Sequence, residues 1–255
     1  MTTFGAIRCV WLRHFDVYRK SLSYGLVTTF AEPLVYLFSF GFGLGSMIGT
    51  VKLLGIDLTY RQFIFAGIVA QTLMFQGFFE AAYGSFIRMY YQKIFQAIAV
   101  TPITLSEVLW AEIMWDASKA TFSASVVITI GVLMGDFNRW GAVVALPFCF
   151  AGAVLFAALG LLVAAKSRTI EEISYPQYLL VFPMFLFCGV FFPLSTLPLY
   201  LQWLAWVLPL TSIVSLVRTL TLGTPLQPQV FVVIILWLAM LVPWSRQAMS
   251  RRLIK

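Results

Sequence analysis

The chain has 255 residues, of which 61% are hydrophobic and only 11% are charged, and its mean hydropathy is +0.91. Water-soluble domains are about half apolar and about one quarter charged, so this composition excludes a soluble fold and predicts an integral membrane protein. The net charge of +7 does not indicate nucleic-acid binding, because Lys and Arg gather at the ends of apolar stretches, where they set membrane topology.

Residues 4–20 predict an amphipathic helix that lies in the membrane interface. Apolar side chains recur every three or four residues and form one stripe, made of Phe4, Ile7, Trp11, Phe15 and Tyr18. Charged side chains occupy the other side, and the segment is too short and too charged to cross a bilayer. The only histidine of the chain also falls here, at position 14.

Apolar stretches beyond residue 20 predict transmembrane helices. Their approximate bounds are 22–48, 63–86, 105–134, 141–165, a stretch that starts near Tyr178 and meets Pro193, and 226–244. Thr104 and Glu107 form a Thr-x-x-Glu capping pattern, which predicts that the third of these helices begins at about residue 105. A basic tail is expected after the last span, with Arg246, Arg251, Arg252 and Lys255.

The segment 194–222 is apolar but contains Pro198 and Pro209, so it could form a seventh span or two half-helices that enter from one side. A seventh span would place the basic tail outside and spoil the cytoplasmic excess of Lys and Arg. We therefore expect an all-α integral membrane fold with six transmembrane helices and both termini in the cytoplasm. An interfacial amphipathic helix precedes the spans, and a re-entrant outer helical hairpin precedes the last one.

Five ionisable residues fall inside the predicted spans: Glu32, Glu80, Glu112, Asp116 and Lys119. Each unpaired charge near the bilayer centre costs about 2.5–3.5 kcal/mol on insertion scales, so such residues usually face a protein interior or a water path. Their spacing puts the last three on one helix face, where Asp116 and Lys119 could neutralise each other. Three interpretations stay open, namely a structural polar clamp between helices, contact with a substrate or a gating role, and snorkelling to the membrane interface, which suits Glu112 near the cytoplasmic end.

The sequence predicts no catalytic and no metal site. It lacks the G-x-x-x-x-G-K-[ST] loop that holds nucleotide phosphates, and one histidine cannot build an H-E-x-x-H zinc site. The three cysteines, Cys9, Cys149 and Cys188, are far apart and are expected to be packing thiols. Energy for transport would have to come from a partner or from a gradient. If the energy comes from a gradient, the chain would be a secondary carrier that uses the intramembrane acids. A further alternative to any transporter is a non-transporting membrane scaffold.

Four stretches resemble the ABC-2 permease family. The stretch 79–89, around Glu80, and the stretch 111–120, around Glu112, are similar to the nodulation-type lipo-oligosaccharide exporter branch. The stretch 188–198 resembles the family signature at the outer end of the fifth span, and 208–218 resembles the piece that follows it. The resemblance covers nearly the whole chain, which we interpret as one permease domain, residues 1–255, without a nucleotide-binding domain.

The resemblance implies a homodimer bound to two copies of a separate ABC ATPase, which would bind ATP and Mg²⁺, while this chain itself needs no cofactor. The segment 88–102 would couple the permease to that ATPase, through Arg88, Met89, Lys93 and Pro102. The outer hairpin would be shaped by Gly189, Pro193, Pro198 and Pro209. The implied function is export of an amphipathic lipid, a lipid-linked saccharide or a hydrophobic drug across or out of a bacterial inner membrane.

Overall fold

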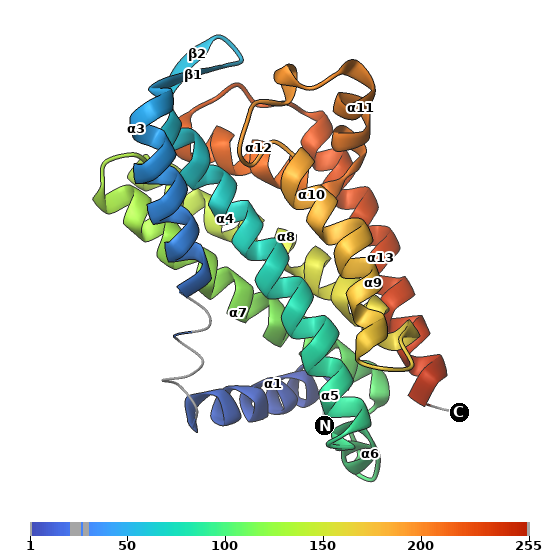
Figure 1. Ribbon diagram of the computed structural model, residues 1–255. Helices are drawn as coiled ribbons and strands as arrows, with labels where there is room; N and C mark the ends of the chain where they lie inside the picture. Colours follow the sequence, from blue (N-terminus) through green and yellow to red (C-terminus); the bar gives the residue numbers. More distant parts are fainter. Residues whose placement is uncertain (1, 21–26, 28–30, 254–255) are drawn as a thin grey trace.

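The computed structural model describes residues 2–20, 27 and 31–253, and these residues are mainly helical. Long helices pack side by side, with helix α1 across one end of the bundle and a β hairpin at the other (Figure 1). The start of the predicted first span, residues 22–30 apart from Val27, lies outside the described residues. The helical membrane fold predicted from the sequence is confirmed.

The elements follow one another along the chain with few breaks. The α-helices are α1 (Thr3–Lys20), α3 (Gly45–Ile48), α4 (Tyr60–Phe79), α5 (Ser85–Tyr90), α6 (Ile94–Ala99), α7 (Leu105–Leu133), α8 (Arg139–Lys166), α9 (Ser174–Pro176), α10 (Phe182–Phe187), α11 (Leu199–Val207), α12 (Pro209–Leu222) and α13 (Gln229–Leu253). The π-helical segments are η1 (Leu37–Leu44), η2 (Glu80–Gly84) and η4 (Gln177–Val181), and the 3₁₀ segments are η3 (Glu171–Ile173) and η5 (Leu194–Thr196).

Five helices of the described chain are long and apolar enough to cross a membrane. They are Ala31–Ile48, Tyr60–Tyr90, Leu105–Leu133, Arg139–Lys166 and Gln229–Leu253. The predicted fifth span is instead a run of short segments, η3 to α10, which begins at Glu171 and ends at Phe187, before the first proline of the hairpin signature. Six spans are reached only if the bent pair α11 and α12 counts as one, so the count of six stays a prediction.

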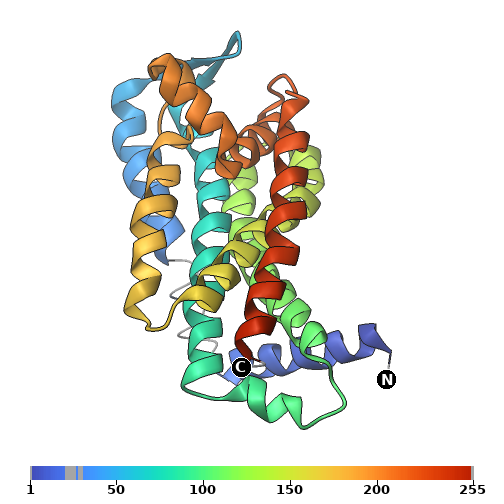
Figure 2. The same cartoon turned by 90° about the vertical axis from the view of Figure 1, so that its right-hand side faces the viewer.

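Helices α11 and α12 meet at an angle of 86° around Leu208. Pro209 occupies the first turn of α12, where a proline is well accommodated because its missing N–H is not needed there. Both helices lie at the hairpin end of the bundle, and neither extends to the α1 end (Figures 1 and 2). This arrangement agrees with the predicted re-entrant hairpin, although its depth in a membrane stays a prediction.

Side-chain caps set the helix starts in the central bundle. The capping box predicted from Thr104 and Glu107 begins α7, and an equivalent box formed by Thr59 and Gln62 begins α4. The Asn138 side chain accepts hydrogen bonds from the first turn of α8. Helices α4 and α8 form the buried centre, and α7 packs against both.

Two elements differ from the sequence prediction. Strands β1 (Thr50–Leu53) and β2 (Ile56–Thr59) form an antiparallel hairpin before α4, and this hairpin was not predicted from the sequence. A sequence signal was present, because a glycine, Gly55, follows a stretch of alternating polar and apolar residues. In the structure Gly55 adopts a φ of 83°, which suits a tight turn. Helix α13 also continues past residue 244, the predicted end of the last span, so Arg246, Arg251 and Arg252 of the basic tail are helical, while Lys255 lies outside the described residues.

Candidate functional site

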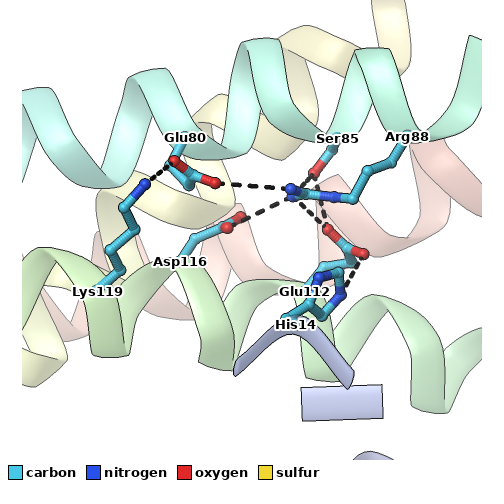
Figure 3. A network of polar contacts seen from close by, with 7 residues as sticks. All are labelled: His14, Glu80, Ser85, Arg88, Glu112, Asp116 and Lys119. Carbon is cyan, nitrogen blue, oxygen red and sulfur yellow. Dashed lines mark hydrogen bonds and ion pairs between the residues drawn. The ribbon is translucent and has the colours of Figure 1, made fainter. Parts of the chain in front are cut away.

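Seven polar side chains from three parts of the chain meet near the α1 end of the bundle (Figure 3). We call this set the charge network. It consists of His14 on α1, Glu80 on η2, Ser85 and Arg88 on α5, and Glu112, Asp116 and Lys119 on α7. Four of the five intramembrane residues singled out by sequence therefore belong to one cluster, and Glu32, which lies on the helix Ala31–Ile48, does not.

Arg88 is the centre of the charge network. Its Nη2 atom lies 2.6 Å from a Glu112 carboxylate oxygen and 3.5 Å from Asp116, and Nη1 lies 3.6 Å from Glu80. Gly84 makes room for this guanidinium, because a Cβ there would come within 2.9 Å of Arg88 Nη1. A planar guanidinium with five N–H donors can contact several carboxylates at once, so Arg88 ties η2, α5 and α7 together.

Lys119 pairs with Glu80 and not with Asp116. The distance from Lys119 Nζ to the Glu80 carboxylate is 2.5 Å, and the two residues are 39 positions apart. The spacing suggested that Asp116 and Lys119 neutralise each other, and this prediction is wrong as to their main partners. Lys119 pairs with Glu80, and the cation nearest Asp116 is Arg88. The partner was missed because a contact between two helices leaves no spacing signal in the sequence.

The carboxylate of Asp116 is the least satisfied group of the charge network. The residue is fully buried, and neither carboxylate oxygen receives a hydrogen bond within the described residues. Its closest cation is Arg88, at 3.5 Å. A buried carboxylate is costly without close partners, so this residue depends on the cations around it.

His14 joins α1 to the charge network and was not recognised from the sequence as a site residue. Its Nε2 atom lies 2.9 Å from the second oxygen of Glu112, and its ring stacks on Trp115 at a centroid distance of 5.8 Å. It is 5% exposed, on a buried α1 face shared with Ala6 and Val10. The four-residue spacing of these three was the available signal, but the larger aromatic stripe concealed it. That aromatic stripe does not mark the buried face of α1, since its first residue, Phe4, is 78% exposed.

A cavity of about 290 Å³ adjoins the charge network between α1, α5 and α7. Arg13, Arg88 and Lys119 supply cationic groups to its wall, and Glu80 supplies an anionic one. Apolar and aromatic surface comes from Val17, Tyr18, Ile87, Ile94 and Trp115. The cavity is therefore amphipathic, with charge on the network side and aromatic rings beside it.

The predicted coupling segment divides into a buried and an exposed part. Arg88 and Met89 are largely buried, so in this structure they offer little surface to a partner. Lys93 and Pro102 are exposed and flank α6, which forms the tip of the molecule at the α1 end (Figure 2). Tyr90, Tyr91 and Val100 add exposed apolar surface around the same tip.

The four residues predicted to shape the outer hairpin lie at its bends. Gly189 follows α10 with a φ of 77°, which favours glycine. Pro193 precedes η5, Pro198 precedes α11, and Pro209 begins α12. These positions agree with the backbone role assigned from sequence, while a functional role for them stays a prediction.

The comparisons with known proteins agree with this architecture. Residues 5–222 match the family described as ABC-2 type transporter. The chain is 30% identical to Nodulation protein J of Rhizobium leguminosarum bv. viciae over 249 residues, covering 96% of this chain and 94% of that protein. It is 32% identical to Nodulation protein J of Rhizobium meliloti (strain 1021) over 218 residues, covering 85% and 81%. It is 24% identical to the inner membrane transport permease YadH of Escherichia coli (strain K12) over 210 residues, covering 82% and 80%.

Proposed function

Because the chain belongs to the ABC-2 type transporter family and so is a membrane subunit of an ABC transporter, we propose that it works as an ATP-driven exporter subunit with a separate ABC ATPase. Its cargo would be an amphipathic lipid, a lipid-linked saccharide or a hydrophobic drug, in a bacterial inner membrane. One relative, YadH, is named an inner membrane transport permease, which supports that location. The assembly would be a homodimer of this chain with two ATPase copies, which bind ATP and Mg²⁺.

The observation that carries this proposal is that the charge network includes Arg88 on α5, the helix that immediately precedes α6 in the chain. Arg88 lies on α5, which leads into α6 through only three residues, Tyr91 to Lys93. Because this connection is so short, a displacement of α6 would also move α5 and Arg88. From there, an ion pair extends to Glu112 on α7, and the other oxygen of Glu112 contacts His14 on α1. Such a chain of polar contacts between helices is a physical route for coupling ATP hydrolysis to helix movement.

The buried and accessible members of the charge network suit different tasks. Glu112 and Asp116 are almost completely buried, which supports the structural clamp over substrate contact and over snorkelling to the interface for these two residues. Glu80 and Lys119 keep 23% and 14% of their side chains exposed, and both line the amphipathic cavity. We propose that these two contact the polar part of the cargo, while the neighbouring aromatic rings accept its apolar part.

The test is co-purification with an ABC ATPase expressed in the same cells. We expect the wild-type chain to retain the ATPase in detergent and the reconstituted pair to hydrolyse ATP. Lys93→Glu should reduce the retained ATPase several-fold, because it reverses the charge of an exposed residue beside α6. Arg139→Glu is the matched control, since Arg139 is exposed at the hairpin end and the change should leave ATPase retention unaltered.

One result would overturn the proposal. If the wild-type chain retained no ABC ATPase and drove transport in proteoliposomes from a proton gradient without ATP, the secondary-carrier alternative would replace it. Equal loss of ATPase with Lys93→Glu and Arg139→Glu would remove α6 from the coupling role.

A further inference from the structure

A second cavity lies at the opposite end of the molecule, enclosed by β1, the turn after α10, helices α11 and α12, and the loop before α13. Its volume is about 220 Å³. A water molecule occupies about 30 Å³ in the liquid, so the cavity has room for a polar headgroup rather than for a single ion. Its polar wall consists of Lys52, Ser195, Gln202, Thr211, Ser215, Arg218, Thr224 and Gln227.

Arg218 is a buried cation with no acidic partner in the described part of the chain. The residue is 5% exposed, and within the described residues it forms no ion pair with a carboxylate. Its Nη2 atom donates to the backbone oxygens of Gly189 at 2.8 Å, Phe63 at 3.2 Å and Val190 at 3.4 Å. Its guanidinium also lies over the Phe63 ring, 3.6 Å from the ring centroid, and no described residue forms a hydrogen bond with its Nε atom. Backbone carbonyls offset only part of a full charge, whereas buried charges are normally paired with an opposite charge.

The rest of the wall also suits an anion. Lys52 adds a second cation from β1, and no acidic residue is present among the described residues that line the cavity. Ser195, Ser215 and Thr224 can donate hydrogen bonds to the oxygens of a bound group. The chemical complement of two cations with several neutral donors is a group with several anionic oxygens.

We propose that this cavity binds the anionic headgroup of an amphiphile, namely a carboxylate, a sulfate or a phosphate ester. The apolar part would lie in the adjoining groove of about 620 Å³, lined by Leu199, Trp203, Trp206, Val233, Leu236 and Trp237, which shares Trp206 and Gln202 with the cavity. The headgroup could come from exported cargo or from a phospholipid. Only the first of these sources rests on the proposed export function.

The test uses the full chain in phosphatidylcholine nanodiscs, with dodecyl phosphate as the probe. Ser215 is partly exposed, lies three residues before Arg218 on α12 and lines the cavity. Ser215→Asp would supply a built-in carboxylate and should weaken dodecyl phosphate binding at least tenfold. Ser215→Asn has nearly the same shape without the charge and should bind like the wild type. Dodecyl maltoside, which carries no charge, should not compete.

Two further arms complete the test. Adding phosphatidylglycerol to the nanodiscs should displace dodecyl phosphate if a bilayer lipid is the natural source, and should not if a single-chain cargo is. Lys52→Glu, at an exposed position, provides a second variant if Ser215→Asp does not fold, and it should also weaken binding. Equal affinity in the Asp and Asn variants, or equal binding of dodecyl maltoside, would overturn the site. Co-purification of the ATPase does not enter this readout, so the two proposals fail separately.

Discussion

At the residue scale, the chain uses two different solutions for buried charge. In the charge network, Arg88 and Lys119 lie beside the three carboxylates, and His14 contacts Glu112, so each cation has a close opposite partner. At the other end, Arg218 contacts three backbone oxygens and the face of the Phe63 ring, and no carboxylate among the described residues pairs with it. Removing one partner of a buried ion pair lowers the free energy of unfolding by about 3–5 kcal/mol, because the other charge is left uncompensated. The first arrangement is therefore suited to holding helices together, and the second to accepting a ligand charge.

The pairing of Lys119 with Glu80 can be tested by mutation, and the sequence alone would have named Asp116 as the partner of Lys119. Lys119→Met should lower the thermal stability of the purified chain, because Glu80 then loses its closest cation. Adding Glu80→Gln should recover more stability than adding Asp116→Asn does. The coupling energy between the Lys119 and Glu80 changes should fall in the range of about 0.5–3 kcal/mol.

The measurement is a double-mutant cycle on unfolding in detergent, followed by tryptophan fluorescence. Asp116→Asn and Glu80→Gln alone serve as the single-variant controls. Better rescue by Asp116→Asn than by Glu80→Gln would show that Lys119 is bound to Asp116, as its three-residue spacing had suggested.

At the element scale, the sequence was informative about features that depend on nearby residues. The cap of α7 and the proline-bounded bends of the outer hairpin follow from local chemistry, and both were predicted at the right positions. The charge network was predicted only as a set of costly residues, because its pairing depends on how η2, α5 and α7 face one another. The π-helical turn Glu80–Gly84 changes which side chains share a face of the helix, and no residue pattern predicted this turn.

Glycine packing between α4 and α8 gives a prediction at this scale. A Cβ on Gly160 of α8 would lie 2.4 Å from the backbone oxygen of Phe78, so the two helices can approach this closely only without a side chain there. Gly160→Ala should destabilise the chain by about 1–3 kcal/mol, as overpacking of a tight core does.

The matched control is Gly43→Ala. Gly43 is also helical, but a Cβ there meets nothing within 4 Å. Alanine at that position should be neutral or slightly stabilising, since alanine favours helix more than glycine does. Thermal unfolding of both variants in the same detergent measures the difference. Equal stability of the two variants would contradict a close α4–α8 contact at Gly160.

At the scale of the whole molecule, the two ends differ in charge and in shape. Helix α1, the tip around α6 and the C-terminal end of α13 lie at one end, and the β hairpin lies with α11 and α12 at the other (Figures 1 and 2). The first end holds most of the Lys and Arg residues, including Arg13, Lys93 and Arg252. Cytoplasmic loops carry an excess of Lys and Arg, so the α1 end should face the cytoplasm. The charge network would then lie on the side where ATP is available, and the anion-binding cavity on the side where cargo leaves.

Cysteine labelling tests this orientation with a residue that the chain already has. Cys9 is exposed on α1, whereas Cys149 and Cys188 are buried, so a membrane-impermeant maleimide should react mainly with Cys9. In intact spheroplasts Cys9 should remain unlabelled and should react only after the membrane is permeabilised. Asp57→Cys, on the exposed side of β2 and in a Cys9→Ser background, should react without permeabilisation. Labelling of Cys9 in intact spheroplasts would reverse the orientation. The charge network would then face away from ATP, and α6 could not be the element that contacts the ATPase.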